Sequence, residues 1–138
     1  MKRILKKIHN NTSGSAIIIG GVAKWLNGYT KTYGKKWIDV SITSEYSSSL
    51  DSLGTRLELD GGTTFPLPIT DQFVIKTTDG YVLDVFIQDE PSESHIVSGS
   101  NVITPQGDVD FHEALYIGVG TDYLLNRLND RKALYGIE

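Results

Sequence analysis

Residues 73–88 read FVIKTTDGYVLDVFIQ, and this stretch decides the predicted fold. Its Asp79-Gly80 dipeptide is typical of tight hairpin turns, which need backbone conformations that these two residue types tolerate. We therefore predict a hairpin of two strands, 73–77 and 81–88. Along the second strand the side chains alternate between two faces of a sheet. One face carries Tyr81, Leu83, Val85 and Ile87, and the other carries Val82, Asp84, Phe86 and Gln88.

Segments on both sides of this hairpin are rich in β-branched and aromatic residues, which favour strands. We predict further strands over residues 3–9, 16–19, 29–33, 37–42, 55–59 and 115–119, and a short helix over 44–53. Thr121 and Gly136 are suited to begin and end a last helix over 122–135. The predicted fold class is therefore mainly β: an antiparallel β-sandwich or barrel with a C-terminal α-helix.

The length of 138 residues and the composition fit one domain that spans residues 1–138. Within it we expect an extended loop or arm over 90–107, rich in turn-forming residues, and the C-terminal helix within 121–135. With 39% hydrophobic and 22% charged residues, the chain is too apolar for disorder, and its apolar runs are too short for a membrane span. The absence of cysteine excludes disulfide scaffolds, thiolate metal sites and cysteine nucleophiles.

Charge is unevenly distributed along the chain. Residues 1–38 carry eight Lys and Arg and no acid, whereas the remainder carries five basic residues and all 17 acids. A basic region of this kind suits nucleic acid or anionic lipid, or the acidic face of a neighbouring subunit in a ring. Alternatively, strands from both halves alternate in one sheet and mix the charges.

Residues 108–113, DVDFHE, form the best metal-like pattern. In a strand, Asp108, Asp110 and His112 would share one face, and two carboxylates with an imidazole suit a divalent ion. The alternative is a solvated strand face without metal. The glycines of Gly118-Val119-Gly120 suit either a phosphate-binding turn or an ordinary strand-to-helix turn.

The catalytic patterns are weak. Three histidines occur without a Gly-x-Ser-x-Gly motif, and the acid pairs Asp84 with Asp89 and Glu90 with Glu93 have chance proximity as their alternative. We therefore predict no enzymatic activity, no catalytic or metal residues and no cofactor. Four aromatic residues lie among lysines, a pattern that suits a platform for sugars or bases, or else anchors of the core. They are Trp25, Tyr29, Tyr33 and Trp37.

The stretches IHNNTSGS (8–15), III (17–19) and WIDV (37–40) resemble the opening of small β-rich virion proteins of tailed bacteriophages, in which a strand, an Asn-Thr-Ser/Gly turn and a β-branched strand follow one another. The resemblance covers about the first 40 residues. It implies a structural role in a neck, tail or fibre-attachment ring. The long acidic second half and the terminal helix depart from the simpler adaptors.

The predicted function is that of a non-enzymatic assembly protein of a phage virion, which docks on other virion proteins. We expect a homo-oligomeric ring, proximity to DNA, no contact with membrane, and localisation in the virion. The alternative is a β-sandwich binding module for carbohydrate or single-stranded nucleic acid. The residues predicted to bind partners are Lys2, Arg3, Lys6, Lys7, Lys35, Lys36, Leu124, Leu128 and Tyr135.

Overall fold

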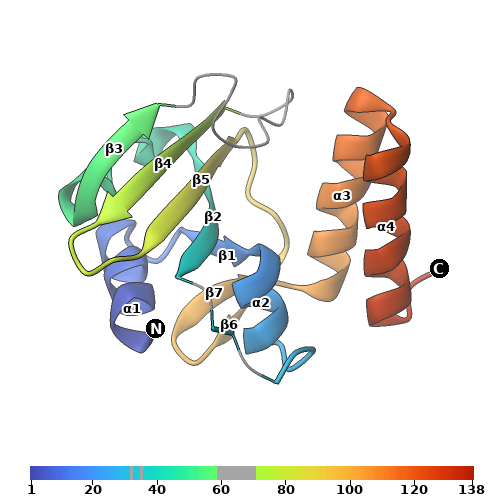
Figure 1. Ribbon diagram of the computed structural model, residues 1–138, viewed down its shortest axis with the longest axis horizontal. Helices are drawn as coiled ribbons and strands as arrows, with labels where there is room; N and C mark the ends of the chain where they lie inside the picture. The colour runs from blue at the N-terminus through green and yellow to red at the C-terminus, as the bar shows by residue number, and fades with distance from the viewer. Residues whose placement is uncertain (32, 35, 59–70) are drawn as a thin grey trace.

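The computed structural model describes residues 1–31, 33–34, 36–58 and 71–138. Its centre is a mixed sheet of seven strands in the order β3-β4-β5-β2-β1-β7-β6 (Figure 1). The strands are β1 (Ile17–Ile19), β2 (Trp37–Thr43), β3 (Gly54–Glu58), β4 (Asp71–Thr77), β5 (Val82–Gln88), β6 (Ser94–Val97) and β7 (Ser100–Ile103).

The hairpin predicted around Asp79-Gly80 is confirmed as β4 and β5. Asp79 accepts a hydrogen bond of 2.6 Å from the Thr77 hydroxyl, and Gly80 has a φ of 89°, which its missing side chain permits. The rest of the sheet is not the predicted sandwich or barrel. Strand β2 pairs in parallel with β5, and β1 pairs in parallel with β7, so the sheet is mixed. Because β2 and β5 are not consecutive, this pairing depends on the whole intervening chain and is not visible in local patterns.

Helix α1 (Lys2–Asn11) occupies the segment that we predicted as a strand over 3–9. Ile4, Leu5 and Ile8 are buried, at a spacing that forms one face of a helix. The Thr12 hydroxyl donates a hydrogen bond of 2.9 Å to the carbonyl of Ile8 at the helix end. An apolar pattern this short fits the period of a strand as well as that of a helix, and packing against the sheet selects the helix.

Helix α3 (Pro105–Val119) replaces the strand predicted over 115–119. The Thr104 hydroxyl accepts a hydrogen bond of 3.0 Å from the backbone N–H of Gly107, and Pro105 occupies the first turn. These are signals of a helix start that our interpretation of the sequence overlooked. Residues 90–107, expected to be an extended loop or arm, contain the hairpin of β6 and β7.

Helix α4 (Asp122–Tyr135) confirms the predicted C-terminal helix, with Thr121 as its N-cap and Gly136 in the left-handed conformation behind it. Helix α2 (Gly20–Leu26) follows β1 directly. Two short 3₁₀ turns, Ser44–Tyr46 and Asp51–Leu53, stand where a helix over 44–53 was predicted. A strand was predicted over 29–33, but the described part of this segment is not a strand. Residue 59, the last residue of the strand predicted over 55–59, lies outside the described residues.

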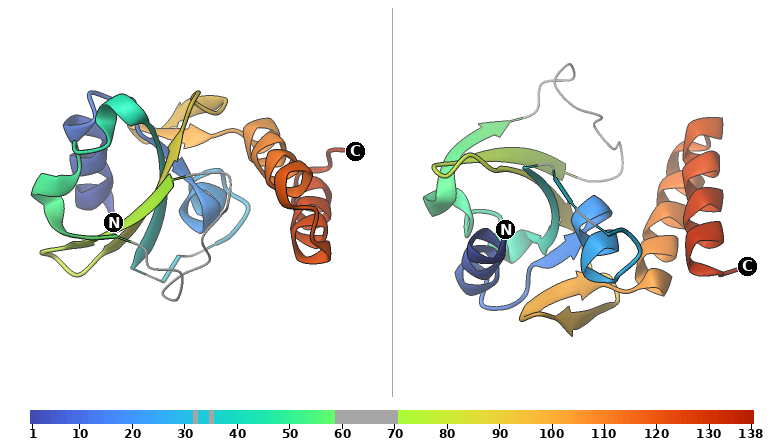
Figure 2. Two further views of the ribbon diagram at one scale, coloured as in Figure 1. Left: turned by 90° about the horizontal axis from the view of Figure 1, so that it is seen from above. Right: turned by 60° about the horizontal axis from the view of Figure 1, so that its bottom comes forward.

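The elements form layers around the sheet. Helix α1 lies on one side of the strands, and α2, α3 and α4 lie on the other (Figure 2). The main hydrophobic cluster contains Ile38, Val40, Leu83 and Val85 of the central strands, each with no measurable exposure. Among the described residues, none of the helices has the length and apolar character that crossing a membrane requires.

Candidate functional site

Two aspartates lie side by side on the sheet. Asp39 of β2 and Asp84 of β5 are direct partners in the register of these parallel strands, so their side chains project from the same face. The Gln72 amide of β4 donates a hydrogen bond of 2.6 Å to Asp84 Oδ1. Both strands are central in the sheet, each aspartate has apolar neighbours before and after it in its strand, and both aspartates are half-buried.

Gly20 closes one side of this carboxylate pair. Strand β1 ends at Ile19, which is the register partner of Asp39, and the chain then turns sharply into α2. Gly20 has a φ of 66°, in the left-handed region that glycine adopts without strain. A Cβ atom at this position would overlap Asp39 Oδ2. Glycine is therefore required here both for the turn and for the close approach of the carboxylate.

Two arginines of α4 supply positive charge to the same region. Arg127 and Arg131 both exert a favourable electrostatic effect on the Asp39 carboxylate. The Arg127 guanidinium also donates a hydrogen bond of 3.2 Å to the Tyr123 hydroxyl. Arg131 Nε lies 3.2 Å from Asp108 Oδ2, which is an ion-pair distance, but its N–H is not aligned for a hydrogen bond.

The electrostatics of the pair are unfavourable when both groups are ionised. Burial raises the pKa of Asp39 to about 7; the charge of Asp84 adds to this effect, and Arg127 and Arg131 oppose it. Burial also raises the pKa of Asp84, against the hydrogen bond from Gln72. The two arginines thus compensate only part of the negative charge, and the site is one in which an added cation would lower the electrostatic energy.

Two hollows meet at Asp39. One is a cavity of about 450 Å³ between the sheet and the helices α3 and α4. The other is a groove of about 900 Å³ beside α2, lined by Lys24, Lys36 and Trp37. Asp39 and the two arginines line both of them, whereas Asp84 lines the cavity alone. The carboxylate pair therefore stands at the junction of two binding spaces of different chemistry.

Asp108 and His112 are neighbours, but on a helix rather than a strand. Asp108, which is 2% exposed, accepts hydrogen bonds from the Tyr135 hydroxyl at 2.5 Å and from His112 Nδ1. Burial alone would raise the pKa of Asp108, but these hydrogen bonds hold it below its ordinary value. Asp110 is exposed and accepts a hydrogen bond from the Gln106 amide.

The three-ligand metal site at Asp108, Asp110 and His112 is therefore not formed. In a helix, residues four apart share a face, whereas the residue between them points away. In the described part of the chain, no group of three His, Cys, Asp or Glu residues is placed to hold a metal. Gly118-Val119-Gly120 ends α3 and leads into α4, so it is a connection between two helices rather than a phosphate-binding turn after a strand.

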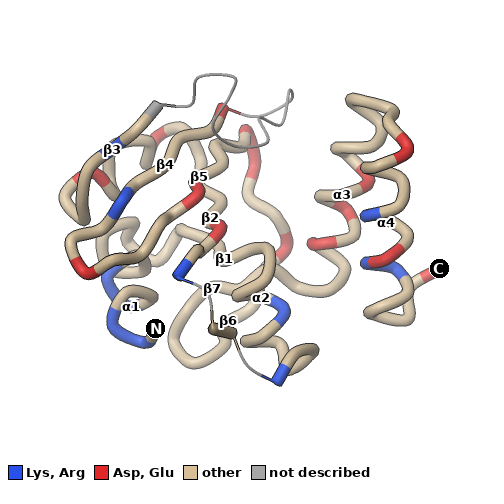
Figure 3. Tube along the Cα trace, viewed as in Figure 1, with Lys and Arg blue, Asp and Glu red and all other residues tan. Residues whose placement is uncertain are grey.

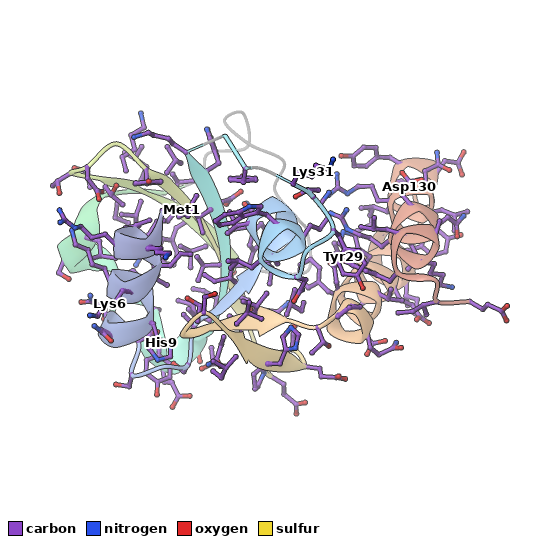
Figure 4. All side chains as sticks on the ribbon, turned by 90° about the horizontal axis from the view of Figure 1, so that it is seen from below. Met1, Lys6, His9, Tyr29, Lys31 and Asp130 are labelled. Carbon is purple, nitrogen blue, oxygen red and sulfur yellow. The ribbon has the colours of Figure 1, made fainter. Side chains whose placement is uncertain are left out.

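The basic residues predicted to bind partners lie mostly away from the carboxylates. Lys2, Arg3, Lys6 and Lys7 are on α1 (Figure 3). Lys6 lies at the opposite end of the molecule from Tyr29 and Asp130 (Figure 4). Their docking role stays a prediction.

The other predicted partner-binding residues are dispersed. Lys36 is exposed, with its ammonium 4.9 Å from the centre of the Tyr81 ring, and Lys35 lies outside the described residues. Leu124 and Leu128 are 7% and 4% exposed, and Tyr135 hydrogen-bonds Asp108. These last three make contacts within the chain, and their role in partner binding stays a prediction.

The four aromatic residues proposed as a platform are only partly gathered. Trp37 is 46% exposed and lines the groove together with Tyr33. Trp25 packs against the core instead. Tyr29 lies edge-on against Tyr135 of α4, with 4.9 Å between the ring centres (Figure 4).

The carboxylate pair was missed because its members are distant in sequence. Each interrupts an apolar strand, WIDVSI for Asp39 and VLDVFI for Asp84, and a single acid inside such a strand is the signal that was available. We had paired Asp84 only with Asp89, which is close in the chain.

Comparison with known proteins shows similarity of structure only. No protein-family model and no curated protein sequence matches the chain. The crystal structure of JHP933 from Helicobacter pylori is 15% identical, with a TM-score of 0.48, and the match covers 80% of this chain. The chain spans about half of that protein, 53% of its length. The solution structure of the antibiotic-resistance factor ANT(2'')-Ia is also 15% identical, with a TM-score of 0.53, and the match covers 96% of this chain and 85% of that one.

The second comparison corrects the predicted function. ANT(2'')-Ia is an aminoglycoside nucleotidyltransferase and not a phage virion protein. The prediction of a phage virion assembly protein is therefore wrong, whereas the prediction that the chain has no enzymatic activity is untested by this likeness of fold. The physical reason for the error is that β-branched strands and polar turns near the N-terminus occur in many folds and do not identify a function.

Proposed function

We propose that this chain is an enzyme that transfers a nucleotidyl group from a nucleoside triphosphate to an acceptor hydroxyl, with a divalent cation held by Asp39 and Asp84. The observation that carries the proposal is the pairing of these two half-buried carboxylates, in register on adjacent strands, between two hollows that share two arginines. The fold it shares with ANT(2'')-Ia supports the reaction class.

The carboxylate pair fits a hard divalent cation. Mg²⁺ is usually bound by one or two carboxylates together with substrate phosphates, so two protein ligands are sufficient. Burial, and to a smaller extent the charge of Asp84, raises the pKa of Asp39, and a bound cation would offset this cost of ionising the carboxyl group. The absence of a side chain at Gly20 keeps the space beside Asp39 Oδ2 clear. When bound, the cation would supply charge neutralisation for the phosphates.

Residues of the chain itself are placed to bind the triphosphate. The groove beside α2 is lined by Lys24 and Lys36, and Arg127 and Arg131 stand where it meets the carboxylates. Ammonium and guanidinium groups are suitable donors to phosphate oxygens. We assign the triphosphate to this groove, with its α-phosphorus next to Asp39 and Asp84.

The transfer exchanges one bond of the α-phosphorus for another. The acceptor hydroxyl oxygen forms a bond to the α-phosphorus, and the bond from the α-phosphorus to the bridging oxygen breaks. Pyrophosphate leaves with the electron pair of that bond, and the hydroxyl proton passes to water. The contribution of Arg127 and Arg131 is to stabilise the negative charge that develops on the phosphates.

The test is cation binding in the presence of a nucleotide that cannot react. Mn²⁺ binding is followed by electron paramagnetic resonance with the α,β-methylene analogue of ATP present. We expect Asp84→Asn to weaken Mn²⁺ binding at least about tenfold, because one of two charged ligands is lost. Asp110→Asn is the matched control, since Asp110 is an exposed acid of α3 outside the site. Equal Mn²⁺ affinity in the wild type, Asp39→Asn and Asp84→Asn would refute the proposal.

A further inference from the structure

We propose that the cavity between the sheet and helices α3 and α4 binds the acceptor, that this acceptor combines a flat apolar ring with a hydroxyl or N–H group, and that His112 accepts a hydrogen bond from it. The identification of the ligand as the acceptor substrate rests on the proposed function. The binding site itself is argued from the cavity.

The tautomer of His112 is determined by its neighbour. His112 Nδ1 lies 2.8 Å from the backbone carbonyl of Asp108 and 3.1 Å from Asp108 Oδ1. Both of these oxygens are acceptors, so Nδ1 carries the hydrogen, and in the neutral ring Nε2 is then an acceptor. Within the described part of the chain, Nε2 makes no hydrogen bond. A 5% exposed imidazole that lines a cavity is thus held rigidly with one acceptor unused.

The walls of the cavity are suited to a flat apolar group. Phe86 of β5 and Phe111 of α3 line it and meet edge to face, with ring centres 6.3 Å apart. Leu115, Val119 and Leu124 complete this apolar lining. A volume of about 450 Å³ is in the range of cavities that bind small molecules, and such sites combine apolar walls with a few fixed polar groups.

The two hollows differ in their lining residues, and this difference assigns one reactant to each of them. The lysines Lys24 and Lys36 line only the groove, which therefore suits the polyphosphate. The phenylalanines and His112 line only the cavity. Both hollows reach Asp39, where the acceptor hydroxyl would meet the α-phosphorus. The cavity therefore has the position of the second substrate.

The arrangement also assigns a role to Asp108 and Tyr135. Their hydrogen bond of 2.5 Å ties α4 to α3 at the carboxylate that contacts His112 Nδ1. Asp108 and Tyr135 are thus positioning residues, which act through His112, whereas His112 itself would touch the ligand.

The experiment uses 4-methylumbelliferone, a flat bicyclic phenol, in its neutral form as a fluorescent probe of the cavity. His112→Asn keeps an N–H donor near Asp108 and removes the acceptor at Nε2. We expect it to bind the probe about tenfold more weakly, the usual effect of losing one hydrogen bond in a buried site. Val119→Phe fills the cavity and should abolish binding. Ile117→Phe, a change on the same helix at a residue 75% exposed and outside the lining, should leave binding unchanged.

The outcomes separate the two proposals. Probe binding that is unaffected by Val119→Phe, or that is displaced by ATP, would overturn the acceptor cavity. If a urea titration shows that His112→Asn does not fold, the comparison of Val119→Phe with Ile117→Phe still decides whether the probe binds in the cavity. A chain that binds the probe in the predicted way but binds no Mn²⁺ would overturn the proposed function and leave the cavity as a ligand site.

Discussion

Replacement of Asp39 by asparagine should make the protein more stable at neutral and alkaline pH while removing its cation site. In the folded protein the pKa of Asp39 is raised to about 7, mainly by burial and also by the charge of Asp84. An ordinary aspartate ionises near pH 3.9, so between these values the folded state holds a proton that the unfolded state has lost. The stability from Asp39 is therefore present at low pH and is lost as the pH rises through about 7.

The size of this loss of stability follows from the shift in the pKa of Asp39. From pH 5 to a pKa of about 7 there are about two pH units, each worth about 1.4 kcal/mol, which gives nearly 3 kcal/mol. Because the carboxylate is only half-buried and solvent screens it in part, we expect about 2 kcal/mol. The free energy of unfolding of the wild type, relative to that of Asp39→Asn, should fall by this amount between pH 5 and pH 8.

Urea unfolding followed by the fluorescence of Trp25 and Trp37 measures this difference at both pH values. Asp110→Asn serves as control and should keep the pH dependence of the wild type, since Asp110 is exposed. Addition of Mg²⁺ at pH 8 should stabilise the wild type and leave Asp39→Asn unchanged, because only the ionised pair attracts the cation. A wild type and an Asp39→Asn variant whose stabilities run parallel from pH 5 to pH 8 would show that our electrostatic reasoning is wrong.

Three further changes test the fold around the site. Gly20→Ala should lower the free energy of unfolding by about 2 kcal/mol in urea, because alanine is strained at a φ of 66° and its Cβ would overlap the Asp39 carboxylate; unchanged stability would contradict this account. Leu128→Ala should cost about 2–4 kcal/mol in the same assay, since Leu128 is 4% exposed, and a loss below about 1 kcal/mol would show that α4 is not packed as described. Tyr135→Phe removes a hydrogen bond that lowers the pKa of Asp108, so this pKa should rise in a ¹³C NMR titration, and no change would argue against the contact.

Local patterns were sufficient to predict the strands β1, β2 and β3, the β4–β5 hairpin and the helix α4. The β4–β5 hairpin follows from Asp79-Gly80, and α4 follows from Thr121 and Gly136, because a turn or a cap involves only residues that are close in the chain. Helix α3 was also accessible, since Thr104-Pro105 is a start signal that we overlooked.

Helix α1 was not decidable from its sequence. Its three buried residues span only five positions, little more than one helical turn, and fit a strand as well as a helix, so packing on the sheet decides between them.

The amino-acid sequence by itself thus determined the composition, the strands β1, β2 and β3, the hairpin and the last helix. Only the tertiary structure created the carboxylate pair. Asp39 and Asp84 are 45 positions apart in the chain, and they meet because β2 and β5 align in parallel and in register. A one-residue slip of either strand would turn its aspartate to the opposite face of the sheet, since side chains alternate with a period of two. Such a long-range register depends on the packing of the whole domain, and no local pattern of residues encodes it.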